Sequence, residues 1–171
     1  MTDTSQQTNF ERTFAARPGV YAGWVQLNTS LREGMDRRRY ELATLAAALR
    51  LRSSYCSLAH GRFLLQQFDE DVAAIARDRQ TAGLDEVDLA VMDFAERVVD
   101  DASTISDADY EPLRRLGLTD DDILDVVLAA AARCFLAKTL DGVGALPDAE
   151  FAALPDDVRN ALVVGRPIAD P

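Results

Sequence analysis

The residues with the most reactive side chains are few, which narrows the search for a chemical site. His60 is the only histidine in a chain of 171 residues, and the only thiols belong to Cys56 and Cys134. Cys56 and His60 stand four residues apart, so on one helix both would project from the same face. An imidazole beside a thiol can accept its proton and stabilise the thiolate, which makes this pair a minimal set for an activated cysteine.

The start of the helix that carries this pair adds a second effect. We expect a helix that begins at Ser53 or Ser54 and continues to about Gln67, which places Cys56 in its first turn. Free backbone N–H groups and the positive end of the helix dipole there favour a negative sulfur by roughly 0.3 to 1 kcal/mol. This is less than the ~1.36 kcal/mol that changes a proton equilibrium by about tenfold. We therefore expect His60 to contribute the larger share.

Glu41 is the third candidate for the site. It lies about 70° from the centre of the apolar stripe on the preceding helix, at the edge of a face that we expect to be buried. If Glu41 meets His60 across the helix pair, it would orient the imidazole ring and raise its basicity. Without that contact it would be an ordinary residue at the boundary between core and solvent.

The spacing of apolar residues is helical throughout, and no stretch alternates as a strand would. The sequence therefore predicts an all-α bundle of about seven to nine helices. We expect a flexible N-terminal segment over residues 1–17, a helical domain over 18–147 and a C-terminal helical tail over 148–171. Within the domain, capping residues open helices at Asp36, Ser106 and Thr119. A helix from Pro18 to Gly34 should carry one buried stripe: Val20, Trp24, Leu27 and Leu31.

The charge distribution argues against several classes of partner. The chain has 29 acidic and 18 basic side chains, a net charge of −11. All of this imbalance falls between Asp85 and Asp125, and no basic patch offsets it, so nucleic-acid binding is not expected. No run of about 18 apolar residues predicts a membrane span, and the polar N-terminus predicts a cytoplasmic protein. One histidine and two cysteines fall short of a zinc site, and we expect neither a metal nor a cofactor.

Around the candidate residues, the sequence resembles a known active-site signature. Residues 40–42 and 53–61 are similar to that of the AhpD-like, or carboxymuconolactone decarboxylase, superfamily: a glutamate, eleven residues, then C-x-x-C-x-x-x-H. Counted from Glu41, the first cysteine position falls on Ser53, the second on Cys56 and the histidine on His60. The likeness extends over about 18–147 and is greatest for the peroxidase-related branch of the superfamily.

This resemblance implies an AhpD-like helical fold, a homo-oligomer that is usually a trimer or hexamer, and thiol peroxidase activity. Cys56 would attack a small-molecule hydroperoxide, with His60 and Glu41 relaying protons and Tyr55 and Ser53 among the binding residues. Ser53 departs from the family pattern because a serine cannot form the resolving disulfide. The sulfenic acid on Cys56 would then be reduced by an external thiol, by Cys134 if the fold brings it near, or not at all.

Two other functions remain open at this stage. The superfamily also implies non-redox acid–base chemistry of the carboxymuconolactone decarboxylase type, in which the histidine rather than the cysteines acts. The third alternative is an oligomeric binding protein whose site is vestigial, which would explain the missing thiol at position 53. Rapid oxidation of Cys56 by peroxide is required only by the peroxidase hypothesis.

Overall fold

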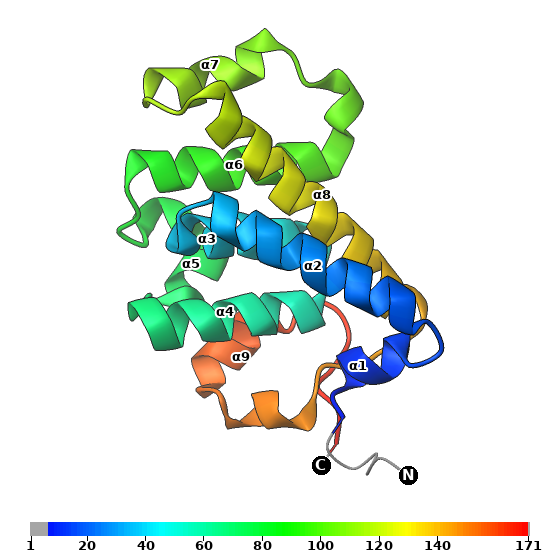
Figure 1. Cartoon of the computed structure of the whole chain (residues 1–171). Coiled ribbons are helices and arrows are strands. Elements are labelled where there is room, and N and C mark those ends of the chain that lie inside the picture. The colour runs from blue at the N-terminus through cyan, green and yellow to red at the C-terminus, as the bar shows by residue number, and fades with distance from the viewer. Residues whose placement is uncertain (1–6, 171) are drawn as a thin grey trace.

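The computed structural model describes residues 7–170, and the described part contains helices and no strand (Figure 1). The prediction of an all-α bundle is confirmed. Short 3₁₀ turns (Arg79–Thr81, Ala102–Thr104 and Ala149–Ala153) join some of the α-helices. The α-helices of residues 7–170 are α1 Asn9–Phe14, α2 Pro18–Gly34, α3 Arg37–Arg50, α4 Ser54–Phe68, α5 Val72–Asp78, α6 Glu86–Asp101, α7 Asp107–Arg115, α8 Asp120–Gly142 and α9 Asp156–Leu162.

Helix α3 is the centre of the bundle. Residues 40–48 of this helix are all buried, and α4, α6 and α8 pack around them. Four of these nine residues are alanines, whose small side chains let neighbouring helices approach closely. The central position of α3 explains why both α4 and α8 can place side chains beside residues of α3.

Several helix starts follow the capping residues that the sequence indicates. The Asp36 carboxylate accepts a hydrogen bond from the backbone N–H of Arg39 at 3.0 Å, at the start of α3. At the start of α7, the Asp109 carboxylate accepts from the N–H of Ser106 at 2.8 Å. The longest helix, α8, begins with the same reciprocal arrangement between Thr119 and Asp122. These local signals set where the helices begin.

The predicted stripe on α2 is wrong in part. Trp24 and Leu31 are buried, but Val20 and Leu27 are each 47% exposed. Helix α2 lies on the outside of the bundle beside α8, as Figure 1 shows, so only a narrow side of it meets other helices. Val20 and Leu27 lie at the edge of that side, about 40° around the helix from Trp24 and Leu31 respectively. They therefore face solvent in the single chain.

The two ends of the chain contribute to the packed structure. We expected a flexible segment over residues 1–17; within the described part of it, residues 9–14 form α1, opened by a capping box between Thr8 and Glu11. Phe14 of this helix is buried, and the backbone N–H of Asn9 donates to Asp148 at 2.6 Å. Residues 1–6 lie outside the described part of the chain.

The C-terminal segment packs against the helix that carries Cys56 and His60. Helix α9 contacts α4 and α5, and Leu162 has no exposed surface. A Cβ atom at Gly61 would lie 2.4 Å from Cδ1 of Leu162, so a larger residue there would force the Leu162 side chain to move. The Ser57 hydroxyl donates to the Leu162 carbonyl at 2.5 Å, and the Gly165 N–H donates to Ser54 Oγ at 2.8 Å. These contacts fix the start of α4.

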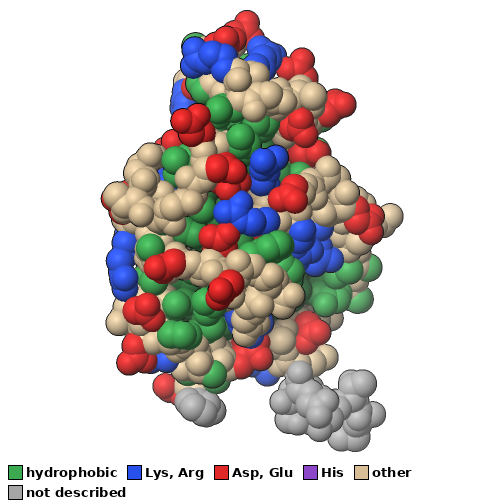
Figure 2. Space-filling view, turned by 90° about the vertical axis from the view of Figure 1, so that its left-hand side faces the viewer, with side chains coloured by type: hydrophobic (Ala, Val, Ile, Leu, Met, Phe, Trp, Pro, Cys, Tyr) green, Lys and Arg blue, Asp and Glu red, His purple; other side chains and the backbone are tan. Residues whose placement is uncertain are grey.

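Charged side chains of the acidic part of the chain form pairs at the surface. Arg97 lies 3.3 Å from Asp109, and Arg114 lies 2.9 Å from Asp120. Figure 2 shows one face of the molecule, on which basic side chains stand singly among acidic ones. Within residues 7–170, no helix combines the length and the apolar character needed to cross a membrane.

Candidate active site

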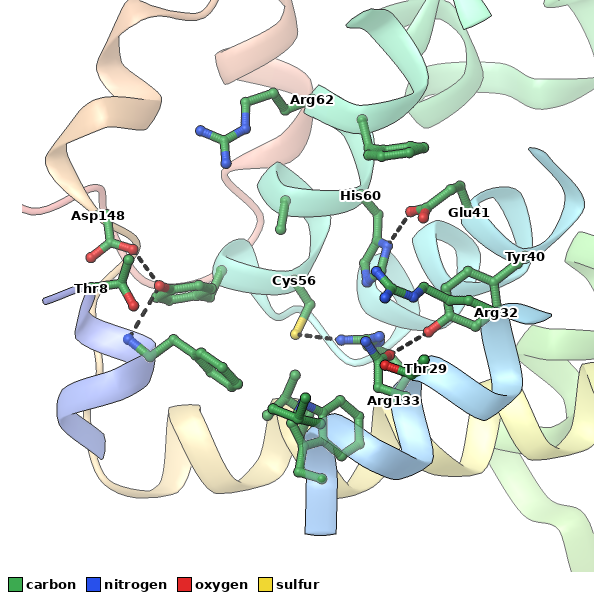
Figure 3. Close-up of a pocket in the computed structure, with 18 of the residues that line it drawn as sticks. Thr8, Thr29, Arg32, Tyr40, Glu41, Cys56, His60, Arg62, Arg133 and Asp148 are labelled. Atoms are coloured by element: carbon green, nitrogen blue, oxygen red, sulfur yellow. Dashed lines mark hydrogen bonds and ion pairs between the residues drawn. The ribbon is translucent and has the colours of Figure 1, made fainter. Parts of the chain in front are cut away.

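Cys56 and His60 line one cavity of about 360 Å³ (Figure 3). Both side chains project from α4, one turn apart, as their spacing predicts. Side chains of α1, α2, α3, α8 and the 149–153 turn form much of the remaining lining. The cavity thus collects residues that are far apart in the sequence.

Glu41 and His60 meet across the α3–α4 pair. His60 Nδ1 lies 2.5 Å from Glu41 Oε2, and the other carboxylate oxygen of Glu41 lies 2.7 Å from Arg37 Nη2. The Thr44 hydroxyl donates to the Tyr40 carbonyl, and its oxygen lies 3.0 Å from the same Nδ1 atom. Glu41 is only 2% exposed, so this carboxylate is held in place by its partners and not by water.

The environment of this pair sets the protonation states. Burial would raise the pKa of Glu41, but His60, Arg37 and Arg133 together lower it, so the group is a carboxylate. Burial, and next the charge of Arg133, lower the pKa of His60 despite the opposing effect of Glu41. A neutral His60 places its proton on Nδ1, where it is donated to Glu41. Nε2 then carries the free lone pair and can accept a proton.

The Cys56 thiol contacts an arginine that the sequence analysis did not single out. Arg133 Nη1 lies 3.7 Å from Cys56 Sγ, and Arg133 is only 3% exposed. The structure records no hydrogen bond between Cys56 and His60 within residues 7–170. Our expectation that His60 contributes the larger share to the activation of the sulfur stays a prediction. Arg133 is a cation in contact with the sulfur, and its guanidinium also lies 5.7 Å from the centre of the Trp24 ring.

A signal for Arg133 is present in the sequence. The arginine follows a run of four alanines, Ala129 to Ala132. Their side chains cannot pair with its guanidinium, so on a close-packed helix its partner must come from elsewhere in the fold. Nothing in that pattern says which helix faces Arg133, because α8 and α4 meet only in the folded chain. Arg32 on α2 also lines the cavity and was missed for the same reason.

The remaining predicted residues lie in different surroundings. Tyr55 lines the cavity; its hydroxyl accepts from the Phe10 N–H at 3.2 Å and donates to Asp148. Burial, and then the Asp148 hydrogen bond, raise the pKa of Tyr55. Ser53 caps α4 by its backbone, has no exposed surface, does not line the cavity, and its hydroxyl has no partner within residues 7–170. Cys134 is partly exposed and does not line the cavity either.

No group of three or more histidine, cysteine or acidic side chains suited to a metal ion occurs in the described range 7–170. The groups that are present can instead handle protons and negative charge. A neutral imidazole with a free Nε2 can act as a general base, and a buried guanidinium can stabilise an anion on sulfur or on a substrate.

Several solved structures share the fold of this chain. A peroxidase-related protein from Ralstonia eutropha JMP134, described as an alkylhydroperoxidase AhpD core, superposes with a TM-score of 0.78 at 25% identity, over 84% of this chain and 78% of that one. A peroxidase-related protein from Silicibacter sp. TM1040 gives a TM-score of 0.69 at 22% identity, over 77% and 72% of the two chains. Both are uncharacterised proteins.

An Agrobacterium tumefaciens protein of unknown function, proposed as an antioxidant defence protein of the AhpD type, gives a TM-score of 0.65 at 19% identity, over 75% of this chain and 90% of that one. No family model and no curated protein sequence matches the chain. The fold is that of AhpD-like proteins, and the chain is similar to peroxidase-related members of that group.

Proposed function

We propose that the protein is a thiol-dependent peroxidase that reduces hydroperoxides through Cys56. The observation that carries this proposal is the contact between the Cys56 thiol and the buried Arg133 guanidinium, in a cavity that also contains the His60–Glu41 pair. A fixed positive charge beside a sulfur favours the thiolate, which is the nucleophile.

The reaction begins with transfer of the Cys56 proton to Nε2 of His60, whose imidazolium form is stabilised by Glu41. The thiolate then attacks the terminal oxygen of the hydroperoxide. The S–O bond forms as the O–O bond breaks, and the alkoxide that leaves takes the proton from His60. The sulfur is oxidised to a sulfenic acid, and the hydroperoxide is reduced to an alcohol.

An external thiol completes the cycle, because Ser53 offers no second sulfur and Cys134 lies off the cavity. The first thiol displaces water from the sulfenic acid and leaves a mixed disulfide on Cys56. A second thiol attacks this disulfide, releases Cys56 and departs as a disulfide of the reductant. A reducing compartment such as the cytoplasm would supply this thiol and keep both cysteines free.

The test is consumption of cumene hydroperoxide by the purified protein with a monothiol reductant. We expect Cys56→Ser to abolish turnover, and the matched variant Cys134→Ser to turn over like the natural protein. Equal turnover in all three proteins, or none in any of them with both reactants present, would contradict the proposal.

One observation favours a second function, non-redox acid–base chemistry. The neutral His60 with its free Nε2 and its Glu41 partner forms a general base without any contribution from the sulfur. In that case His60→Gln would abolish proton exchange at the acidic carbon of a bound lactone acid, whereas Cys56→Ser would retain it.

The apolar surface of the single chain supports self-association. Helices α2 and α8 lie side by side and carry most of the exposed large apolar side chains: Val20, Val25, Leu27, Leu124, Leu128 and Phe135. Exposed apolar side chains gathered on two neighbouring helices are typical of a protein interface. We propose that it joins copies of the chain in a closed homo-oligomer. Light scattering that gives a stable monomer of 18.7 kDa would contradict this.

A further inference from the structure

The cavity holds positive charge that the protein does not neutralise. Four arginines line it, although the chain as a whole is strongly acidic. Arg37 pairs with Glu41 at 2.7 Å, and Arg62 pairs with Glu150 at 2.7 Å. Arg32 and Arg133 form no ion pair with a carboxylate of residues 7–170. Two lining arginines without a carboxylate partner are unexpected in a protein whose acidic residues outnumber its basic ones.

Both unpaired guanidiniums also have hydrogen-bond donors that nothing accepts. The Nε atoms of Arg32 and Arg133 are buried and have no partner within residues 7–170. Arg133 is fixed among its neighbours and only 3% exposed, so water does not solvate it freely. A buried charged donor without a partner is unfavourable, and an anion that enters the cavity would remove that penalty.

The position of these groups shows where an anion would lie. In Figure 3 the guanidiniums of Arg32 and Arg133 reach the same space, next to His60 and Cys56. The Asp148 side chain lies at the opposite end in Figure 3, and the Tyr55 hydroxyl donates to it. Apolar and aromatic side chains also line the cavity: Phe10, Trp24, Val25, Phe63, Leu136 and Phe151.

We propose that Arg32 and Arg133 form an anion-binding subsite, and that the ligand of this cavity is an organic carboxylate with an apolar body. A guanidinium offers two parallel N–H groups that match the two oxygens of a carboxylate. The apolar lining would hold the hydrocarbon part of the molecule, and the volume of about 360 Å³ suits a small organic acid.

The balance of charge favours a monoanion. Four arginines and three acidic residues, Glu41, Asp148 and Glu150, line the cavity, so the excess is one positive charge. Proton transfer from Cys56 to His60 leaves this sum unchanged, and one carboxylate bound at Arg32 balances it. This step rests on the peroxidase function proposed above. With that function, the substrate class is hydroperoxides of organic acids, whose carboxylate binds Arg32.

Binding can be measured without any peroxide, because the chain contains one tryptophan, Trp24, and it lines the cavity. Hexanoate would be titrated while the Trp24 fluorescence is recorded, with hexanamide as the neutral match and inorganic phosphate as an anion without an apolar body. We expect hexanoate to bind saturably. Hexanamide and phosphate should each bind about tenfold or more weakly than hexanoate, a difference of the size expected for loss of one charged hydrogen bond.

Variants assign the effect to Arg32. Arg32→Gln should weaken hexanoate binding by about tenfold or more. Arg32→Lys keeps the charge but loses the planar pair of donors, so its affinity for hexanoate should lie between those of Arg32→Gln and the natural protein. Arg115→Gln removes the same charge from an exposed arginine outside the cavity and should bind hexanoate normally. Unchanged hexanoate binding in Arg32→Gln, or equal binding of hexanamide, would overturn the proposal, and phosphate binding as tight as hexanoate would overturn the carboxylate assignment.

The outcomes separate this inference from the proposed function. Hexanoate binding that depends on Arg32, in a protein that consumes no hydroperoxide, would refute the peroxidase and leave the anion subsite intact. Peroxide turnover without hexanoate binding would refute the subsite and leave the peroxidase intact.

Discussion

Arginines occur both on the acidic surface of this molecule and in its cavity, and their surroundings differ in the two regions. In the acidic region formed by α6, α7 and the start of α8, arginines pair with aspartates at the surface, as Arg114 does with Asp120. In the cavity, Arg133 is buried and its Nη1 lies 3.7 Å from the Cys56 thiol. Water and salt screen the surface pairs, so their net contribution is small. Burial strengthens the interactions in the cavity, and there the charge can change the chemistry of a neighbour.

The largest effect should come from the buried carboxylate. Glu41→Gln keeps the shape of the side chain and one oxygen that can accept from His60, but it removes the negative charge and leaves Arg37 without its ion-pair partner. Removal of one member of a buried ion pair is expected to lower the free energy of unfolding by about 3 kcal/mol. Urea unfolding, followed by circular dichroism, measures this. A variant as stable as the natural protein would show that loss of a charged partner costs no more stability in the cavity than at the surface.

The next effect concerns the reactivity of the sulfur. Arg133→Gln removes the positive charge 3.7 Å from Cys56 Sγ, so we expect alkylation of Cys56 by iodoacetamide at pH 7 to slow by about tenfold. Arg114→Gln, which changes a surface pair, is the matched control and should leave the rate unchanged. If the two variants alkylate at the same rate, the Arg133 contact does not activate the thiol.

The two regions should also respond to acid at different pH. The pKa of His60 is lowered in the folded protein, so the unfolded chain takes up this proton first. Stability from His60 is present above about pH 6.5 and falls as the pH drops below that value toward the folded pKa. His60→Gln should therefore flatten the dependence of the free energy of unfolding on pH just below pH ~6.5. The same slope in the variant would contradict a buried neutral imidazole.

In the acidic region the stability is lost at lower pH. The backbone N–H of Ser106, and then its hydroxyl, lower the pKa of Asp109 below the ordinary 3.8. The Thr119 hydroxyl, and then its N–H, lower the pKa of Asp122 in the same way. Both carboxylates stabilise the fold above about pH 4, and this contribution disappears as the pH falls through their folded pKa values. Asp122→Asn should alter only this lower range.

The smallest effect belongs to the surface ion pair. Asp120 is 79% exposed, so Asp120→Asn should leave the urea midpoint of unfolding unchanged within error. The same unfolding measurement as for Glu41→Gln gives the direct comparison. A loss of stability as large as that of Glu41→Gln would mean that exposure does not separate the two regions.

The sequence was sufficient for the parts of the structure that depend on local signals. Asp36 and Thr119 mark the helix starts at which they are found, and the four-residue spacing places Cys56 and His60 on one face of α4. Glu41 could be placed at the edge of a buried face, and the structure brings it to His60. Each of these predictions depends on residues within one helix or on two successive helices.

The features that were missed depend on contacts between distant helices. Arg133 and Cys56 are separated by 77 residues, and only the packing of α8 against α4 brings them together. The exposure of Val20 and Leu27 depends on how α2 is rotated against α8, which the apolar spacing of α2 does not determine. The local pattern predicts that a face is apolar, and the tertiary packing decides which edge of it is covered.

The most direct test of the account compares the two thiols of the same molecule. Cys56 lies beside Arg133 in the cavity, whereas burial raises the pKa of the Cys134 thiol on the next residue of α8. The protein would be treated with one equivalent of hydroperoxide in the presence of a sulfenic-acid trap, and the two cysteine peptides quantified over time by mass spectrometry. The account predicts that Cys56 is trapped at least about tenfold faster than Cys134. Faster labelling of Cys134, or no labelled Cys56, would contradict it.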